Sequence, residues 1–189
     1  KIPHTYWCMV LGTLAITGVG VPLLYILDTP IGFAGFVSKE NVIWTTYAVG
    51  TTAGNFAYFA LSFAAIFTAF YSWRLIALTF HGETRADHHT YEHAHESPPV
   101  MMIPLYLLAI GAVIAGMEFY PQFLGHHEND WWGPAIFNAV REVNGVEVTS
   151  MVEHAKHIPV LAMVFPFCCM LFGAFMAYLF YWKYPQIGR

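Results

Sequence analysis

The chain of 189 residues has few charged side chains. Lysine, arginine, aspartate and glutamate make up 11% of it, whereas soluble domains carry about 25%. Hydrophobic residues account for 57% of the chain, and the mean hydropathy is +0.50. A soluble domain of this composition would offer water too little polar surface, so the shortage of charge predicts a membrane protein. The formal net charge of −4 gives no basic surface for nucleic acid.

Cysteine is also scarce, and the motifs of soluble enzymes are missing. Cys8, Cys168 and Cys169 all fall within apolar runs, where we expect them to pack as small hydrophobic residues. Their spacing matches no zinc or iron–sulfur site. The sequence contains no dinucleotide fingerprint, P-loop or nucleophile motif. We therefore expect this chain to bind no metal and no cofactor itself.

Long apolar runs fill most of the sequence. A helix needs about 20 apolar residues to cross the hydrocarbon core of a membrane. Four stretches are long enough, and they predict an all-α, polytopic transmembrane helix bundle with about four spans, the first one discontinuous. The predicted divisions are residues 1–54 (discontinuous helix), 55–80 (helix), 81–99 (histidine-rich loop), 100–123 (helix), 124–157 (polar loop) and 158–183 (helix).

The first stretch is interrupted over residues 20–37, where glycine and proline are frequent. Proline removes a backbone donor and glycine loosens the chain, so we expect a broken helix that resumes near Ser38, with Ser38 as its cap. Backbone groups freed at membrane depth must face protein or water, so the break implies a polar cavity. The alternative is two separate spans joined by a surface turn at Asp28–Pro30.

The positive charges predict an orientation. With four crossings, one side carries Lys1, Arg85, Lys183 and Arg189, and the other carries Arg141 and Lys156. The positive-inside rule then places both ends and the loop 81–99 on the cytoplasmic or matrix side. If the first stretch were two spans, the ends would lie on opposite sides.

Lys39 and Glu40 stand side by side after the interruption, and apolar, uncharged sequence flanks the region. A charge inside a membrane costs about 2.5–3.5 kcal/mol even on lenient insertion scales, and such residues often serve ions or protons. Burial disfavours the charged form of a lysine, whereas an adjacent carboxylate favours it. A lysine whose carboxylate partner can move is therefore a candidate proton switch. The alternative is that Lys39 snorkels at a helix end.

Arg74 and the histidine-rich loop are weaker candidates. Arg74 is the only charged residue within residues 55–80. It is a possible site residue, and the alternatives are a snorkelling side chain or an ion pair with a neighbouring helix. In the loop, His89 and His93 have a spacing that suits a metal on a helix. Acidic residues alternate with the histidines there, so we favour a solvated interface loop without a metal.

Several runs resemble one known family in their order and spacing. These runs are KIPHTYW (1–7), GTLAITG (12–18), GFAGFVSKE (32–40), TAFYSWRLI (68–76) and FHG (80–82). They resemble the largest antiporter-like membrane subunit of respiratory complex I, which is chain 5 of NADH-ubiquinone oxidoreductase, or subunit L in bacteria. Residues 87–98 resemble its alphaproteobacterial and mitochondrial branch. The tail beyond Pro121 is less similar.

The resemblance implies that the chain corresponds to the C-terminal third of a larger subunit, with its twelfth to fifteenth spans. It would be a fragment of that subunit or a separately encoded piece, and alone it would be inert. In the family, the lysine in the broken helix belongs to the distal proton channel and the neighbouring acid to the exit route. These roles carry over to Lys39 and Glu40. Arg74 matches an arginine of the family motif.

The resemblance also implies partners and a location. The partners would be the other membrane subunits of complex I, the missing remainder of the same subunit, and membrane lipids. The location would be the bacterial inner membrane or the mitochondrial inner membrane. NADH, FMN, iron–sulfur clusters and quinone would be bound by other subunits.

Two other functions remain open at this point. The first is an Mrp-type cation/proton antiporter subunit, which shares the broken helix and the lysine. Phe80–Gly82 and the histidine-rich loop favour complex I over this reading. The second is a non-transporting membrane scaffold piece, in which Lys39 and Glu40 would only pack against neighbours. The cost of breaking a helix at membrane depth argues against a scaffold.

Overall fold

A computed structural model describes residues 1–26, 29–82, 84, 86–125, 127–135, 141–143, 146–148, 155 and 157–186. The main helices are α1 (Pro3–Thr17), α2 (Ala34–Ala48), α3 (Thr52–Phe80), α5 (Pro99–Phe123) and α8 (Val160–Tyr178), which the π-helical turn η2 (Leu179–Lys183) continues. The short elements are α4 (His88–Glu92), α6 (Glu128–Trp132) and the 3-10 turn η1 (Gly133–Ala135). Two antiparallel hairpins pair β1 (Gly20–Ile26) with β2 (Thr29–Gly32) and β3 (Arg141–Val143) with β4 (Val146–Val148).

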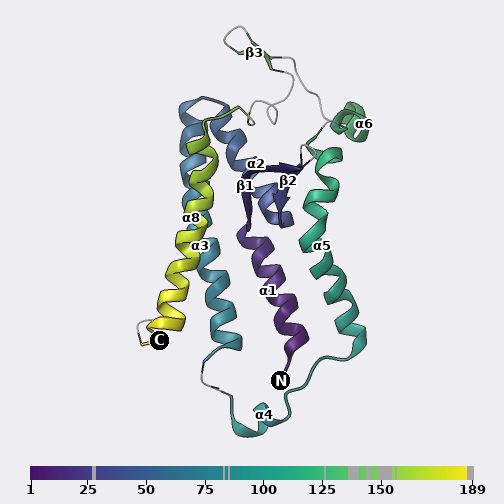
Figure 1. Ribbon diagram of the computed structural model, residues 1–189, viewed down its shortest axis with the longest axis vertical. Helices are drawn as coiled ribbons and strands as arrows, with labels where there is room; N and C mark the ends of the chain where they lie inside the picture. The colour runs from purple at the N-terminus through teal and green to yellow at the C-terminus, as the bar shows by residue number, and fades with distance from the viewer. Residues whose placement is uncertain are drawn as a thin grey trace.

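The long helices confirm the predicted membrane bundle, although the hairpins make the chain mainly rather than entirely helical. Within the described residues, three helices are long and apolar enough to cross a membrane: Thr52–Phe80, Pro99–Phe123 and Val160–Lys183. Helices α1 and α2 have 15 residues each, which is short of the roughly 20 that a crossing needs. They follow one another along the long axis of the molecule, with β1 and β2 between them (Figure 1).

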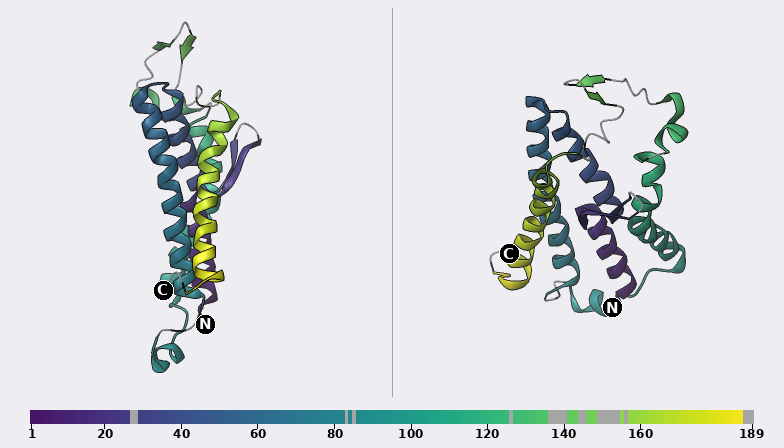
Figure 2. Two further views of the ribbon diagram at one scale, coloured as in Figure 1. Left: turned by 90° about the vertical axis from the view of Figure 1, so that its left-hand side faces the viewer. Right: turned by 45° about the horizontal axis from the view of Figure 1, so that its top comes forward.

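Helices α1 and α2 occupy the middle of the bundle. Helix α5 flanks them on one side, and the closely packed pair α3 and α8 flanks them on the other (Figures 1 and 2). Both termini lie at the same end of the molecule together with α4, whereas α6 and the β3–β4 hairpin lie at the opposite end (Figure 1). The interruption between α1 and α2 is therefore enclosed by helices on two sides, and it lies well away from both ends.

The β1–β2 hairpin was not expected from the glycine and proline content of this segment. Its register pairs Gly20 with Gly32 and Ile26 with Thr29, so strand pairing satisfies part of the backbone freed by the break. The Phe36 ring, only 1% exposed, lies against both glycines and leaves no space for a side chain there. The hairpin thus depends on one aromatic ring from the following helix, which the local sequence pattern does not reveal.

Helix α2 begins at Ala34, one turn earlier than the sequence predicted. Phe33 is extended and its carbonyl accepts the first amide bonds of the helix, from Phe36 and Val37. The Ser38 hydroxyl donates to the Ala34 carbonyl over 3.1 Å, so Ser38 lies inside the helix and the predicted serine cap is wrong. The early start is possible because Gly35, without a side chain, lets α2 touch the backbone of Ala15 on α1.

Close contact between α3 and α8 forms much of the buried core. Gly173 of α8 lies against the backbone of Ile66 on α3, where a Cβ atom would collide with the Ile66 carbonyl. Ala65, Ala69 and Met170 pack beside this contact. Small residues at such positions let membrane helices approach each other closely. The resulting rigid pair forms one wall of the region around Glu40.

Candidate functional site

Lys39 links the two halves of the interrupted helix. Its Nζ atom donates a hydrogen bond to the carbonyl oxygen of Ile16 over 3.3 Å. Ile16 lies in the last turn of α1, where carbonyl groups have no partner within the helix and carry the negative end of the helix dipole. An ammonium group is favourable at that position. The lysine therefore has a specific acceptor at the break.

Glu40 is buried without a hydrogen-bond donor for one of its oxygens. Its side chain is only 3% exposed, and Oε2 has no hydrogen-bond partner among the described residues. Tyr58 of α3 and Cys169 of α8 lie within electrostatic range of this carboxyl group. Burying an unpaired carboxylate is costly, so the position calls for a proton or a water molecule on that oxygen.

The two side chains lie on different faces of α2. Successive residues on a helix are rotated by roughly 100°, so Lys39 reaches α1 while Glu40 enters the core beside α3 and α8. They interact electrostatically. Within the described part of the chain, no hydrogen bond or ion pair joins them. The arrangement leaves the lysine sensitive to the charge on Glu40 while keeping each group with its own neighbours.

Tyr58 and Pro166 belong to this region, and sequence reasoning missed both. Proline has no amide hydrogen, so Pro166 inside α8 leaves the Ala162 carbonyl without its helical partner. The hydroxyl of Tyr58, which is 2% exposed, donates to this carbonyl over 2.9 Å. Nearby, Trp44 Nε1 donates to the Met163 carbonyl over 3.2 Å. The signal in the sequence was a proline in an apolar span, because the carbonyl that it frees needs a buried donor from a neighbouring helix.

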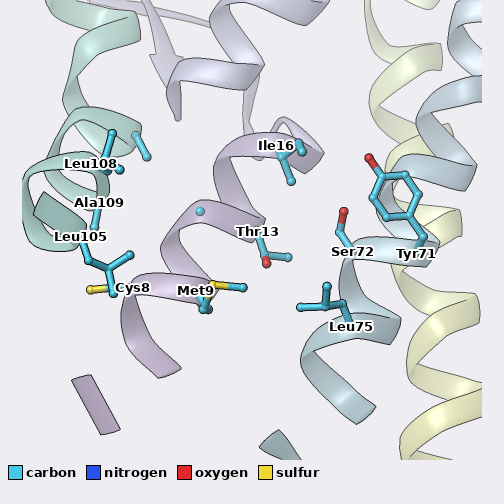
Figure 3. Close-up of a pocket in the computed structure, with 12 residues that line it drawn as sticks. Cys8, Met9, Thr13, Ile16, Tyr71, Ser72, Leu75, Leu105, Leu108 and Ala109 are labelled. Carbon is cyan, nitrogen blue, oxygen red and sulfur yellow. The ribbon is translucent and has the colours of Figure 1, made fainter. Parts of the chain in front are cut away.

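A cavity of about 320 Å³ lies between α1, α3 and α5 (Figure 3). Its walls are mostly apolar, with hydroxyl groups from Thr13, Tyr71 and Ser72. The Ser72 hydroxyl is buried and has no hydrogen-bond partner among the residues that the structure describes. The cavity extends to Ile16, the residue whose carbonyl holds Lys39, so this mostly apolar space lies next to the break.

Comparison with known proteins identifies relatives of this chain, although no family model matches it. It is 48% identical to NADH-quinone oxidoreductase subunit L of Rhodobacter capsulatus, over 86% of this chain and 22% of that protein. It is 32% identical to NADH-ubiquinone oxidoreductase chain 5 of Phytophthora infestans, over 97% of this chain and 25% of that protein. The chain is homologous to the subunit L and chain 5 family.

This family relationship confirms the resemblance found in the sequence. A further relative is F(420)H(2) dehydrogenase subunit L of Methanosarcina mazei, which is 31% identical over 96% of this chain and 26% of that protein. The chain spans about a quarter of the length of these relatives. The homology to subunit L and chain 5 therefore concerns about a quarter of the length of those proteins.

Arg74 lies apart from the other two candidates. Its guanidinium carbon is 5.9 Å from the centre of the Tyr181 ring, in the turn that follows α8. It is sixteen positions along α3 from Tyr58, which corresponds to about 24 Å. The structure does not bring Arg74 to Lys39 or Glu40, and its contact with Tyr181 suits an anchor between the ends of α3 and α8.

The histidine-rich loop shows no metal site in its described part. No group of three or more histidine, cysteine, aspartate or glutamate residues in the described ranges is arranged to hold a metal ion. The His89 and His93 rings stack with their centres 4.3 Å apart, and His93 Nδ1 lies 2.9 Å from the His89 carbonyl. Of the cations used for the predicted orientation, Arg85, Lys156 and Arg189 lie outside the described residues, as does the side chain of Arg141.

Proposed function

We propose that this chain is part of the proton-translocating membrane arm of an NADH:quinone oxidoreductase, with Lys39 and Glu40 as the groups that carry protons. Homology to subunit L and chain 5 supports the assignment to this complex. The main structural support for these two residues is the hydrogen bond from Lys39 to the Ile16 carbonyl. Next to it lies the buried Glu40, whose Oε2 atom has no hydrogen-bond partner among the described residues. NADH oxidation and quinone reduction belong to other subunits, which bind the NADH, FMN, iron–sulfur clusters and quinone.

The proposed mechanism uses the charge of Glu40 to control Lys39. With Glu40 ionised, the lysine keeps its proton and its bond to the Ile16 carbonyl. When Glu40 takes up a proton, or when a neighbouring subunit shifts the local charge, the ammonium loses stabilisation and releases its proton. Moving one charge against the membrane field costs about 2.3 kcal/mol per 100 mV, which electron transfer in the other subunits must supply.

We also propose that α1 and α2 together make one discontinuous crossing of the inner membrane. Each half is too short to span, and the two follow one another along the long axis (Figure 1). With α3, α5 and α8 this gives four crossings, an even number that suits two termini at the same end of the molecule. That end carries Lys1 and Lys183 and would face the cytoplasm or the matrix. The partners in this arrangement are the other membrane subunits, the rest of the same subunit, and lipids.

The relatives differ in the electron donor that their names give. One homologue is named as a subunit of an F(420)H(2) dehydrogenase rather than an NADH dehydrogenase. The region shared with this chain therefore suits proton translocation driven by different electron donors. NADH is proposed here because the most similar of the relatives described above carries that name. Copurification with flavin and iron–sulfur subunits supports complex I, whereas copurification with antiporter subunits alone would indicate an Mrp-type complex.

The decisive experiment replaces Lys39 with alanine in the assembled complex. We expect normal assembly and a loss of proton pumping driven by electron transfer, because no other cation is placed at the Ile16 carbonyl among the described residues. Ser38→Ala is the matched control, since Ser38 is an exposed neighbour that bonds its own helix. Pumping at the wild-type level by a fully assembled Lys39→Ala complex would refute the proposed role.

A further inference from the structure

Helix α1 begins without a cap of its own. Its N-cap residue is Ile2, which has no side-chain hydrogen bond to the first turn. Pro3 at the first position lacks an amide hydrogen, but the amides that follow still need acceptors. A helix end of this kind is usually capped by a serine, threonine, aspartate or asparagine at the N-cap position. The missing local cap means that an acceptor must come from elsewhere.

Glu96 supplies that acceptor from the far end of the histidine-rich loop. Its Oε1 atom accepts hydrogen bonds from the backbone amides of His4 at 2.6 Å and Thr5 at 3.3 Å. Its Oε2 atom accepts from the Thr5 hydroxyl at 2.7 Å. Both carboxylate oxygens are used, and they meet the second and third residues of α1, where a capping side chain normally binds. The negative charge also lies at the positive end of the helix dipole.

Other contacts hold the same loop against α1. The Lys1 ammonium donates to the carbonyls of Tyr91 at 2.7 Å and Glu92 at 3.0 Å, and it lies over the Tyr91 ring. At the start of the loop, His81 Nε2 is 3.2 Å from the Tyr6 hydroxyl. The loop between α3 and α5 is therefore attached to the first turns of α1 at both of its ends.

We infer that Glu96 is a positioning residue for Lys39, acting through α1. Helix α1 has Glu96 bound at its first turn and the Ile16 carbonyl, which holds Lys39, in its last turn. Fifteen helical residues span about 22 Å, so the two contacts lie at opposite ends of one continuous helix. Releasing the first turn shifts the acceptor of the lysine at the other end. The inference rests on the proposed function of Lys39, whereas the capping contact stands without it.

The test compares Glu96→Ala, Glu96→Gln and Glu92→Gln in the whole assembled complex. Glu92 is the matched control, because it is an acid of the same loop whose side chain pairs only with His88 among the described residues. Hydrogen exchange is followed in peptides from residues 3–17 and 34–48, together with the number of protons pumped per NADH oxidised. The loss of a cap should speed exchange in the first turn of α1 roughly 2- to 30-fold in Glu96→Ala. Glu96→Gln keeps an acceptor and should fall between Glu96→Ala and the wild type.

The readouts separate positioning from simple stabilisation. A positioning role predicts that exchange also rises around Lys39 in residues 34–48, and that fewer protons are pumped per NADH in Glu96→Ala at normal assembly. Faster exchange confined to the first turn, with unchanged pumping, would overturn the inference. If Lys39→Ala itself pumps normally, the proposed function fails, and faster exchange in Glu96→Ala would then support the capping contact alone.

Discussion

The side chain of Lys39 reaches across the helix break to the carbonyl oxygen of Ile16, 3.3 Å away. This bond joins residues 23 positions apart and connects the second half-helix to the end of the first. The lysine thus places a titratable group in the bundle and satisfies a backbone group that the break leaves free. Any event that removes its charge also weakens the junction between α1 and α2.

Substitutions of Glu40 should lower pumping without unfolding the bundle. Glu40→Gln keeps the volume of the side chain, so we expect assembly at the wild-type level and a reduction of pumping that is milder than that of Lys39→Ala. Glu40→Ala should reduce pumping further, since it also removes any oxygen that could bind water. Proton pumping and complex assembly are measured together. Full pumping by Glu40→Ala would show that the acid is not needed for proton transfer.

Glycine at position 35 should be essential for the junction between the half-helices. In Gly35→Ala the new Cβ atom would collide with the Ala15 carbonyl, and a backbone atom has little freedom to move away. Overpacking of this kind costs about 1–3 kcal/mol, and we expect a lower melting temperature together with weaker pumping.

Gly12→Ala is the matched control for Gly35→Ala, because a Cβ atom at Gly12 meets nothing within 4 Å. Alanine is a better helix former than glycine by about 1 kcal/mol, so Gly12→Ala should be neutral or stabilising. Thermal unfolding of the two variants in detergent measures the difference. Equal stability of the two would mean that α1 and α2 are not in backbone contact at Gly35 and Ala15.

The hydroxyl of Tyr58 should matter because Pro166 leaves the Ala162 carbonyl free. Tyr58→Phe removes the donor, and interhelical hydrogen bonds in membrane proteins contribute about 0.6 kcal/mol on average, with a maximum near 1.7 kcal/mol. Pro166→Ala restores an amide donor for the same carbonyl. In the background of Pro166→Ala, the loss caused by Tyr58→Phe should therefore shrink. If Tyr58→Phe lowers the melting temperature equally with and without Pro166→Ala, the Ala162 carbonyl is not the shared acceptor of the two donors.

The sequence predicts the helices that are long and apolar enough to contact lipid. Helices α3, α5 and α8 follow from long apolar runs, because a segment that contacts lipid must be apolar and must satisfy its own backbone. The β1–β2 hairpin did not follow from the sequence, since its register depends on Phe36 filling the space beside Gly20 and Gly32. Tertiary packing decides such a local structure.

The sequence singled out Lys39 and Glu40, but it revealed neither their geometry nor the contributions of Tyr58 and Pro166. A lysine and an acid in apolar sequence are costly enough to attract attention wherever they point. Their directions depend on the start of α2, and that start is set by the contact between Gly35 and Ala15 rather than by a capping side chain. The sequence predicted that α2 starts near Ser38, one turn later than its observed start at Ala34. For this reason it revealed neither the Ile16 acceptor of Lys39 nor the burial of Glu40.

The contact between Glu96 and α1 should be insensitive to pH in the neutral range. Partial desolvation raises the pKa of Glu96. The hydrogen bonds from Thr5 and the His4 amide, together with the electrostatic effect of His4, lower it by more. The pKa of Glu96 therefore lies below its usual value of 4.5. A lowered pKa means that the ionised cap contributes its full stability above 4.5 and loses it as the pH falls through the pKa of the folded state. The difference in melting temperature between wild type and Glu96→Ala should therefore stay constant from about pH 6 to 8 and narrow only in acid.

A series of melting curves at different pH values measures this difference, with Glu92→Gln as the control. The control should follow the wild type at every pH, because its side chain does not contact α1. His4 is the histidine that faces Glu96 from α1. A difference between wild type and Glu96→Ala that already disappears between pH 8 and pH 6 would therefore identify a histidine, rather than the carboxylate, as the group that controls the attachment of the loop.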